Sequence, residues 1–234
     1  MTAPNLPGPR PEDLARVAQA ALKHVADGML LGLGTGRAAE AFIEALGERV
    51  RAGLRVRAVP TSNRSAELAT RLGIEVLGLA DVDHLDVAFD GADEVTPELA
   101  LTKGLGGALL RERVVAFEAK RFVVLVTPEK MVPKLGTRTP IPIEVVPFAE
   151  PSAARHLKAL GGQPAVRKRP DGAPFVTDNG NWILDTRFAP IDDPVRLDAA
   201  VLRIPGVVDD GFFLGMADLV LVGDEGAVRE LARR

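Results

Sequence analysis

The sequence predicts an α/β protein, in which a parallel sheet flanked by helices is joined to a smaller α+β domain with an antiparallel sheet. Three observations lead to this prediction. Strand-like and helix-like segments alternate between residues 11 and 127, short segments separated by Pro, Gly, Asn and Asp fill 137–207, and a buried-strand pattern returns at 217–223. The smaller domain is therefore expected to be inserted before the C-terminal return to the first sheet.

The first region reads as repeated strand–helix–strand units. After a Pro-rich, loose lead-in (residues 1–10), apolar residues keep a helical period from Pro11 onward, and "MLLGLG" (29–34) is typical of a buried strand entering a glycine turn. The segments that follow are a helix at 38–50, a strand at 55–59, a helix at 64–72, strands at 74–78 and 86–90, and a strand at 121–127. Helical crossovers of this kind join parallel strands, so both faces of the sheet are expected to be covered.

The second region has shorter apolar segments and more proline than the first. "TRTPIPIEVVPF" (137–148) carries three prolines among β-branched residues, which favours an edge strand or a linker over a central parallel strand. The remaining expected elements are a helix at 151–160, short strands at 164–168, 174–178 and 181–185, a hairpin turn at 177–181, and a helix at 194–204. We predict a first domain of residues 1–136 and 208–234 and a second of residues 137–207.

Composition excludes several classes of function. The net charge is −3, and Lys and Arg are scattered along the 234 residues, which argues against a nucleic-acid or membrane partner. The chain has no cysteine, so it has no disulfide, thiolate metal site or cysteine nucleophile. No apolar run approaches the roughly 20 residues that span a bilayer, and the N-terminus lacks a signal-peptide core, so a cytoplasmic protein is expected.

Two strand ends carry residues that suit an anion. "GLGTGR" (32–37) leaves the first strand and opens a helix, whose N–H groups and positive dipole end favour a negative ligand. "VPTSN" (59–63) repeats the pattern with two hydroxyl groups. The candidate binding residues are Gly34, Thr35, Gly36, Arg37, Thr61 and Ser62. A tight turn that merely needs glycine, and a helix N-cap, explain the same residues without a ligand. The pattern lacks the third glycine of the dinucleotide fingerprint.

"TKGLGGALLRERVV" (102–115) is more specific. Lys103 precedes a glycine turn in which Gly104 and Gly106 offer backbone N–H groups to an oxyanion. On the following helix, Glu112 falls within an arc of apolar residues, Ala108, Leu109, Val115 and Ala116. Burial raises the pKa of a carboxyl group, as a general base working near neutral pH requires. The alternative, pairing with Arg111 or Arg113, is disfavoured because sequence neighbours point to different helix faces.

"DVAFDGADEV" (86–95) concentrates four carboxylates at the end of one strand. The apolar "VAF" delivers Asp90 to the rim of the sheet, Gly91 allows a tight turn, and Asp93 returns toward the ligand, while Asp86 and Glu94 are expected to be solvated or paired charges. Lys130, after the strand at 121–127, adds a positive charge. An anion site, a lysine, a buried carboxylate and two aspartates above one sheet suit proton transfer next to the carbonyl of a small phosphorylated substrate.

The chain also resembles a known family, type A ribose-5-phosphate isomerase. The resemblance rests on the series "DGADE", "KGLGG" and "RE", with "PTS", "EKMVPKLG", "PIPIEVVPF", "DNGNWILD" and "IPGVV" in the same order. It implies a Rossmann-like domain with a small α+β domain, and interconversion of ribose 5-phosphate and ribulose 5-phosphate in the non-oxidative pentose phosphate pathway. It also implies that no metal or organic cofactor is needed and that the chain forms a homodimer or homotetramer.

The resemblance implies a role for each matching residue. Glu112 becomes the base that moves a proton between C1 and C2 through an enediolate, and Asp90 handles ring opening or proton movement between the oxygens. Asp93 binds sugar hydroxyls, Lys103 stabilises developing negative charge, and Lys130 helps hold the substrate. The glycine turn at residues 34–37 takes the phosphate. This turn differs from the family's usual G-T-G-S-T, because Arg37 and Ala38 replace two hydroxyl residues, and Leu105 stands where relatives usually have glycine.

Three other functions fit parts of the pattern. A non-catalytic sugar-phosphate sensor is disfavoured because neither end of the chain carries a basic helix-turn-helix segment. A metal-dependent phosphoryl-transfer enzyme would use Asp90, Asp93 and Glu94 on Mg²⁺, but no nucleotide motif supports it. Acyl-CoA transfer or amino-sugar deamination on the same fold is disfavoured by the spacing of the lysine and the glutamate.

Overall fold

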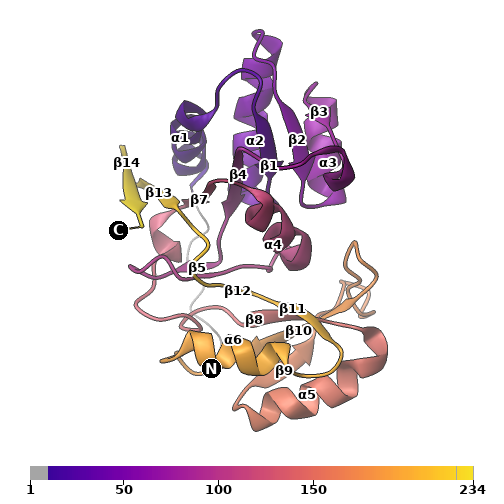
Figure 1. Cartoon of the computed structure of the whole chain (residues 1–234). Helices are drawn as coiled ribbons and strands as arrows, with labels where there is room; N and C mark the ends of the chain where they lie inside the picture. Colours follow the sequence, from indigo (N-terminus) through magenta and orange to yellow (C-terminus); the bar gives the residue numbers. More distant parts are fainter. Residues whose placement is uncertain (1–9, 225, 234) are drawn as a thin grey trace. The chain divides into compact units, whose positions relative to one another are not determined.

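The computed structural model describes residues 10–224 and 226–233, so nearly all of the Pro-rich lead-in lies outside the described residues. The chain forms two compact units (Figure 1), the first of Met1–Ala92, Arg111–Met131 and Gly215–Arg234 and the second of Asp93–Leu110 and Val132–Leu214. The predicted domain bounds at 136 and 208 stay a prediction, and these units differ from them mainly in grouping Asp93–Leu110 with the second unit.

The first unit contains a seven-stranded sheet in the order β14-β13-β7-β4-β1-β2-β3. Neighbouring strands are parallel except for β13 and β14, which are antiparallel. The strands are β1 (Leu30–Leu33), β2 (Arg57–Pro60), β3 (Glu75–Val76), β4 (Val87–Gly91), β7 (Phe122–Val126), β13 (Leu219–Asp224) and β14 (Ala227–Ala232). The parallel sheet and the return of the chain to it are confirmed. The edge strand β14 was not predicted, because its residues are mostly exposed, with two charges at its centre, and give no buried-strand signal.

Helices cover both faces of this sheet. They are α1 (Pro11–Ala21), α2 (Arg37–Arg51), α3 (Asn63–Arg71) and α4 (Leu109–Glu118). Leu31 and Leu33 point into a core shared with Phe42 of α2, whereas Gly32 between them faces α4. A Cβ added to Gly32 would lie 2.5 Å from Cγ1 of Val115 on α4. Because strand side chains alternate between faces, α2 and α4 pack on opposite sides of β1, and α4 approaches so closely that only glycine fits.

The second unit contains two antiparallel sheets, a four-stranded one in the order β11-β8-β10-β9 and a three-stranded one in the order β12-β6-β5. Their strands are β5 (Glu94–Val95), β6 (Leu101–Thr102), β8 (Ile141–Val145), β9 (Gln163–Val166), β10 (Trp182–Arg187), β11 (Val207–Asp210) and β12 (Phe212–Phe213). The helices are α5 (Glu150–Ala159) and α6 (Pro194–Leu202), and short 3₁₀ turns across the two units are η1 (Leu22–His24), η2 (Leu79–Asp81), η3 (Pro128–Lys130) and η4 (Pro147–Ala149). The predicted α/β fold with a smaller antiparallel α+β part is confirmed.

The expectation of an edge strand or linker at 137–148 was wrong. β8 lies inside the four-stranded sheet, between β10 and β11. Its pairing with β11 stops at Ile143, so Pro142 removes no hydrogen bond from that side. The prolines therefore limit the length over which β8 pairs with β11, but they do not prevent β8 from lying inside the sheet.

The predicted strand at 174–178 forms only two isolated bridges, Lys168 with Pro174 and Val176 with Trp182. The hairpin turn does form, since the N–H of Thr177 donates to the carbonyl of Asn181 at 2.9 Å. Side chains of the turn bind the buried carboxylate of Glu144 on β8, whose Oε1 accepts from Thr177 Oγ1 and Asn181 Nδ2, both at 2.9 Å. The turn is thus fixed by a buried acceptor as well as by strand pairing.

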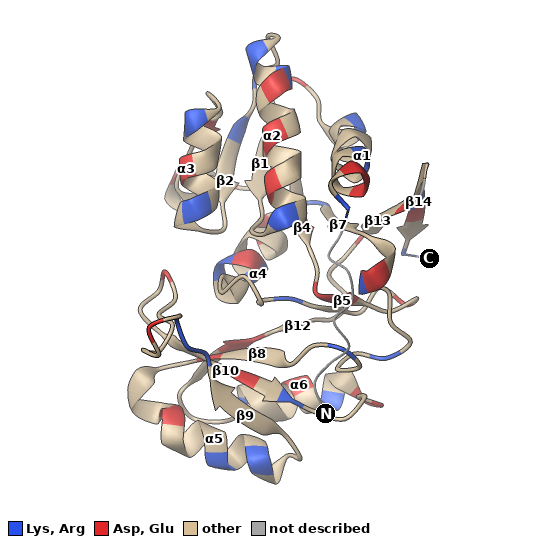
Figure 2. Cartoon of the chain, turned by 180° about the vertical axis from the view of Figure 1, so that it is seen from behind, with Lys and Arg blue, Asp and Glu red and all other residues tan. Residues whose placement is uncertain are grey.

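Charged residues are distributed over both units, with Lys and Arg interspersed among Asp and Glu along the helices (Figure 2). Within the described part of the chain, no helix is long and apolar enough to cross a membrane.

Asp86, just before β4, links the start of β1 to the segment between α4 and β7. Its carboxylate accepts from the Leu30 N–H at 2.9 Å and from Lys120 Nζ at 3.1 Å. The Leu30 hydrogen bond, helped by Lys120, lowers the pKa of Asp86 below its usual value despite the opposing effect of burial. The folded state therefore favours the charged carboxylate more than the unfolded chain does, so this stabilisation is present above about pH 4 and lost as pH falls through the folded-state pKa.

We accordingly expect Asp86→Asn to lower the free energy of unfolding by about 1–2 kcal/mol at pH 7, because a charged acceptor is lost. The deficit should shrink at pH 3, because there the unfolded wild-type chain binds a proton at Asp86 that the folded state disfavours. Urea unfolding at the two pH values measures this, with Asp83→Asn, at an exposed site nearby, as the control. A deficit that is the same at both pH values would contradict the assignment.

Candidate active site

The glycine turn after β1 is built around the side chain of Asp90. The N–H of Gly34 donates to the carbonyl of Phe89 at 2.9 Å, and the N–H of Thr35 donates to Asp90 Oδ1 at 3.1 Å. A Cβ on Gly34 would lie 2.1 Å from Cγ of Asp90, which is only 3% exposed. Glycine is therefore required at position 34 because a carboxylate occupies the place of its side chain.

Gly91 and Glu94 differ from the sequence expectation. Gly91 continues β4 without a left-handed φ, and an added Cβ would come no closer than 3.7 Å to another atom, so the chain does not need glycine there to turn. Glu94 is fully buried rather than solvated. Its carboxylate accepts from three backbone N–H groups between residues 136 and 139, at 2.5–2.8 Å. Glu94 therefore holds that loop, which is a structural role.

Four hydroxyl groups cluster beside the glycine turn. Thr35 Oγ1 lies 2.7 Å from Thr61 Oγ1 and donates to Ser62 Oγ at 2.8 Å. Ser62 is also the N-cap of α3, accepting from the N–H of Ser65 at 3.1 Å, and Ser65 Oγ donates to the carbonyl of Gly34 at 2.6 Å. The capping interpretation of Ser62 is thus correct, but capping does not exclude a second role. Ser65 was missed, although its place three residues after an N-cap was the available signal.

The first turn of α2 offers uncapped backbone groups. Gly36 is its N-cap, with φ of +103°, and no side chain caps the helix. Arg37, the first helical residue, is exposed, and Arg64 at the start of α3 pairs with Glu40 of α2 at 2.7 Å. Since the N-terminal N–H groups of a helix carry a partial positive charge, this turn with its hydroxyl cluster suits an anion such as phosphate.

Glu112 lies in the first turn of α4 and is only 3% exposed. Val115 and Ala116 on the same helix are buried as well, whereas Phe117 and Glu118 are exposed. The predicted burial of Glu112 is confirmed. A carboxylate is costly to bury unless polar groups or function compensate, so this position is a strong candidate for acid–base chemistry.

Lys130 is the remaining predicted site residue in the first unit. It is the last residue of the 3₁₀ turn η3, which follows β7, and it is partly buried. Its backbone N–H donates to the carbonyl of Thr127 at 2.9 Å, which fixes the turn beyond the carboxyl end of that strand.

Lys103 in the second unit is buried, with 2% exposure. Its N–H donates to the carbonyl of Gly211 at 2.9 Å, and its ammonium lies 5.4 Å from the ring centroid of Phe213. A cation over an aromatic face is attracted by the ring quadrupole, which offsets part of the loss of hydration.

The glycine turn that follows Lys103 is tied to Asp93. The N–H of Leu105 donates to Asp93 Oδ2 at 3.0 Å, and the N–H of Asp93 donates to the carbonyl of Thr102 at 2.7 Å. Gly104 has φ of +101°, and a Cβ there would meet Leu109 at 2.9 Å, so the turn requires glycine. Asp93, Lys103, Gly104 and Gly106 thus gather on one short segment of the second unit.

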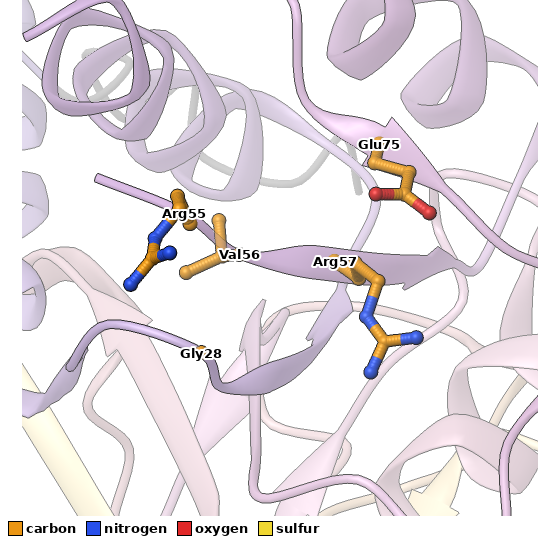
Figure 3. Close-up of a pocket in the computed structure, with 5 residues that line it drawn as sticks. All are labelled: Gly28, Arg55, Val56, Arg57 and Glu75. Atoms are coloured by element: carbon orange, nitrogen blue, oxygen red, sulfur yellow. The ribbon is translucent and has the colours of Figure 1, made fainter. Parts of the chain in front are cut away.

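The predicted site residues of the first unit lie at or beyond the carboxyl ends of β1, β2, β4 and β7 or at the start of α4. A cavity of about 390 Å³ lies instead at the amino ends of β1 and β2, lined by Gly28, Arg55, Val56, Arg57 and Glu75 (Figure 3). Arg55 in this cavity is already paired with Asp27 at 2.5 Å. In open parallel sheets ligands bind at the carboxyl ends of strands, so this cavity is not the candidate active site.

A metal site is not evident in residues 10–224 and 226–233, where no group of three or more His, Cys, Asp or Glu side chains is placed to hold an ion. Glu94, one of the three carboxylates considered for Mg²⁺, is committed to backbone N–H groups.

Comparison with known proteins identifies the family. The family model described as ribose 5-phosphate isomerase A (phosphoriboisomerase A) matches residues 57–227. The chain belongs to this family. A relative from Thermomicrobium roseum, named ribose-5-phosphate isomerase A, is 52% identical over 219 residues, which cover 93% of this chain and 92% of the relative.

Solved structures of the family agree with the fold. Ribose 5-phosphate isomerase A from Methanocaldococcus jannaschii matches with a TM-score of 0.90 at 42% identity, covering 94% of this chain and 98% of that one. A D-ribose-5-phosphate isomerase in complex with phospho-erythronic acid matches with a TM-score of 0.93 at 38% identity over 100% of both chains. The chain is therefore an enzyme of the aldose–ketose isomerase class, with ribose-5-phosphate isomerase activity.

The contact between Gly34 and Asp90 gives a direct test of the site. In Gly34→Ala, the new methyl group would displace the Asp90 carboxylate, so kcat/KM for ribose 5-phosphate should fall by about 10- to 100-fold. The free energy of unfolding should fall by about 1–3 kcal/mol. Steady-state kinetics and urea unfolding measure the two effects.

Gly91→Ala is the matched control on the other side of Asp90, because its added Cβ makes only ordinary contacts of 3.7 Å and 3.8 Å. Its activity should stay within about threefold of wild type. Equal activities of the two alanine variants would show that the Asp90 carboxylate does not depend on the space at position 34.

Proposed function

We propose that this enzyme interconverts D-ribose 5-phosphate and D-ribulose 5-phosphate through an enediolate, with Glu112 as the general base. The observation that carries the proposal is the burial of the Glu112 carboxylate, 3% exposed, at the start of α4. The proton next to a sugar carbonyl is weakly acidic, so its removal needs a base held in place and shielded from bulk water. Glu112 would take the proton from C2 of the aldose and return it to C1 to give the ketose.

Two further groups would handle charge on the substrate oxygens. Lys103 carries a buried ammonium that would stabilise the negative charge developing on the enediolate oxygen. Asp90, held by the N–H groups of Thr35 and Gly91, would move protons during ring opening and between O1 and O2. Neither role needs a metal or organic cofactor, so activity is proposed to be independent of both.

The remaining predicted residues would bind the substrate. The uncapped first turn of α2, with Gly34, Thr35, Gly36 and Arg37, would take the phosphate, and Thr61 and Ser62 would extend the hydroxyl lining. Asp93, Gly104 and Gly106 would contact the sugar oxygens, and Lys130 would add a cation. The neighbour solved with phospho-erythronic acid, a phosphorylated four-carbon sugar acid, supports a small phosphorylated ligand here.

We place this reaction in the non-oxidative pentose phosphate pathway and in the cytoplasm. A dianionic sugar phosphate does not cross a bilayer unaided, so an enzyme that uses it is expected where such sugars are made.

Glu112→Gln tests the base. The amide keeps the size of the side chain but has no proton-accepting carboxylate, so kcat should fall by about 10³-fold or more, while binding of ribose 5-phosphate changes by less than about threefold. The aldose-to-ketose assay and exchange of the substrate's C2 proton with heavy water both report the step. Glu118→Gln, at an exposed position on the same helix, is the control and should retain wild-type rates.

Turnover of Glu112→Gln near the wild-type rate would remove Glu112 from the mechanism. Exhaustive dialysis against a chelator is the companion experiment, and full activity afterwards is expected. Loss of activity that Mg²⁺ restores would favour the metal-dependent alternative.

We also propose that the enzyme is a homodimer or homotetramer. Two large apolar side chains, Phe117 at 78% and Phe148 at 96% exposure, stand out from the described surface and suit burial against another copy. Light scattering should give two or four times the mass of a single chain. A single-chain mass at micromolar concentration would contradict the proposal.

A further inference from the structure

Arg167, just after β9, makes a set of contacts that the mechanism above does not use. Its Nε and Nη2 donate to the two carboxylate oxygens of Asp185 on β10, at 2.9 and 2.5 Å. Its Nη1 donates to the carbonyl oxygens of Gly104 and Leu105, at 3.0 and 3.1 Å. The guanidinium side chain is only 13% exposed. Arg167 therefore joins the four-stranded sheet to the glycine turn after Lys103 within the second unit.

These contacts set the direction of two successive peptide groups. In a trans peptide the N–H points opposite to the carbonyl oxygen, and the described chain has no cis peptide bond. Because the carbonyls of Gly104 and Leu105 point to Arg167, the N–H groups of Leu105 and Gly106 point away from it. The first of these N–H groups agrees with this geometry, since it donates to Asp93 Oδ2 at 3.0 Å.

The second N–H group is available to a ligand. Gly106 is exposed, and within residues 10–224 and 226–233 its N–H donates to no acceptor. The turn is rich in glycine, which gives its backbone more freedom than other residues would allow. A contact from outside the turn is therefore needed to hold this donor in one direction before the substrate binds. The ion pair of Arg167 and Asp185 forms this external clamp.

The aromatic ring of Phe175 completes the clamp. It lies 5.7 Å from the guanidinium carbon of Arg167, and a Cβ on Gly107 would lie 2.5 Å from the ring. Arg167 is thus held by a carboxylate on one side and an aromatic face on another, while it binds the turn. A lysine could not reproduce this, because only a guanidinium binds a carboxylate in a fork and two carbonyls at once.

We propose that Arg167, oriented by Asp185, is a positioning residue that aims the Gly106 N–H at the oxygen on which negative charge develops in the reaction. This inference rests on the proposed function, because the charge it serves is that of the enediolate. A prepositioned donor stabilises the transition state more than the bound sugar, so its loss lowers kcat rather than raising KM.

The test compares Arg167→Met, Arg167→Lys and Asp185→Asn with wild type. Arg169→Met is the matched control, because Arg169 is two residues away and its side chain pairs with the surface residue Asp171, at 3.3 Å. For each variant, kcat and KM for ribose 5-phosphate are measured. Inhibition by a four-carbon phosphorylated hydroxamate, which mimics the enediolate, and by ribitol 5-phosphate, which has no carbonyl, is measured as well.

We expect Arg167→Met to lower kcat by about 10- to 100-fold and to leave KM within about threefold. The hydroxamate should bind more weakly by a similar factor, whereas ribitol 5-phosphate should bind nearly as well as to wild type. Relative to Arg167→Met, Arg167→Lys should regain less than half of the lost kcat on a logarithmic scale. Asp185→Asn should lower kcat by about 3- to 10-fold. Arg169→Met should have the kcat of wild type.

A wild-type kcat in Arg167→Met would overturn the inference. An equal loss of affinity for the hydroxamate and for ribitol 5-phosphate would overturn it too, because general disorder of the site weakens both ligands alike. If Arg167→Met does not fold, as judged by circular dichroism, Arg167→Lys and Asp185→Asn decide the question by the same criteria. Failure of the proposed base is read separately, from turnover of Glu112→Gln with Arg167 intact.

Discussion

The approach of the Asp90 carboxylate to the backbone of the turn after β1 is the constraint on which the first unit's site depends. Adjacent parallel strands end at the same edge of the sheet, so β4 delivers Asp90 beside the turn that leaves β1. The carboxylate accepts the Thr35 N–H and occupies the space of a side chain at position 34. That arrangement frees the next N–H groups, at the start of α2, to face a ligand, and it brings Thr35 into hydrogen-bond distance of Thr61 and Ser62.

Buried charged side chains occur at structural as well as at candidate catalytic positions. Glu94 and Glu144 are fully buried, and each accepts several hydrogen bonds that fasten a loop: backbone N–H groups in one case, the side chains of the 177–181 turn in the other. Lys103 lies near the ring of Phe213, and Glu112 is buried in the first turn of α4. The hydrogen bonds of Glu94 and Glu144 assign these two carboxylates a role in the fold.

The fold was predictable where the signal was local. Alternation of apolar runs with helical periods located the strands and helices of the parallel sheet, because burial on both faces leaves a continuous apolar run in each strand. It failed at β14, whose exposed residues carry no such run, and at β8, where prolines suggested an edge position. Whether a proline interrupts a sheet depends on which residues of the neighbouring strand pair with it, and that is a property of the register rather than of the segment.

By itself, the sequence determined the α/β class, the parallel sheet and the burial of Glu112, because the position of a residue on a helix follows from spacing alone. It also supplied the motifs that mark the isomerase family. Only the tertiary structure revealed that Asp90 fills the space at Gly34 and that Arg167 holds the carbonyls of two turn residues 63 and 62 positions earlier in the chain. Such contacts join segments whose sequences carry no mutual signal, so they are decided when the chain packs and not by any local pattern.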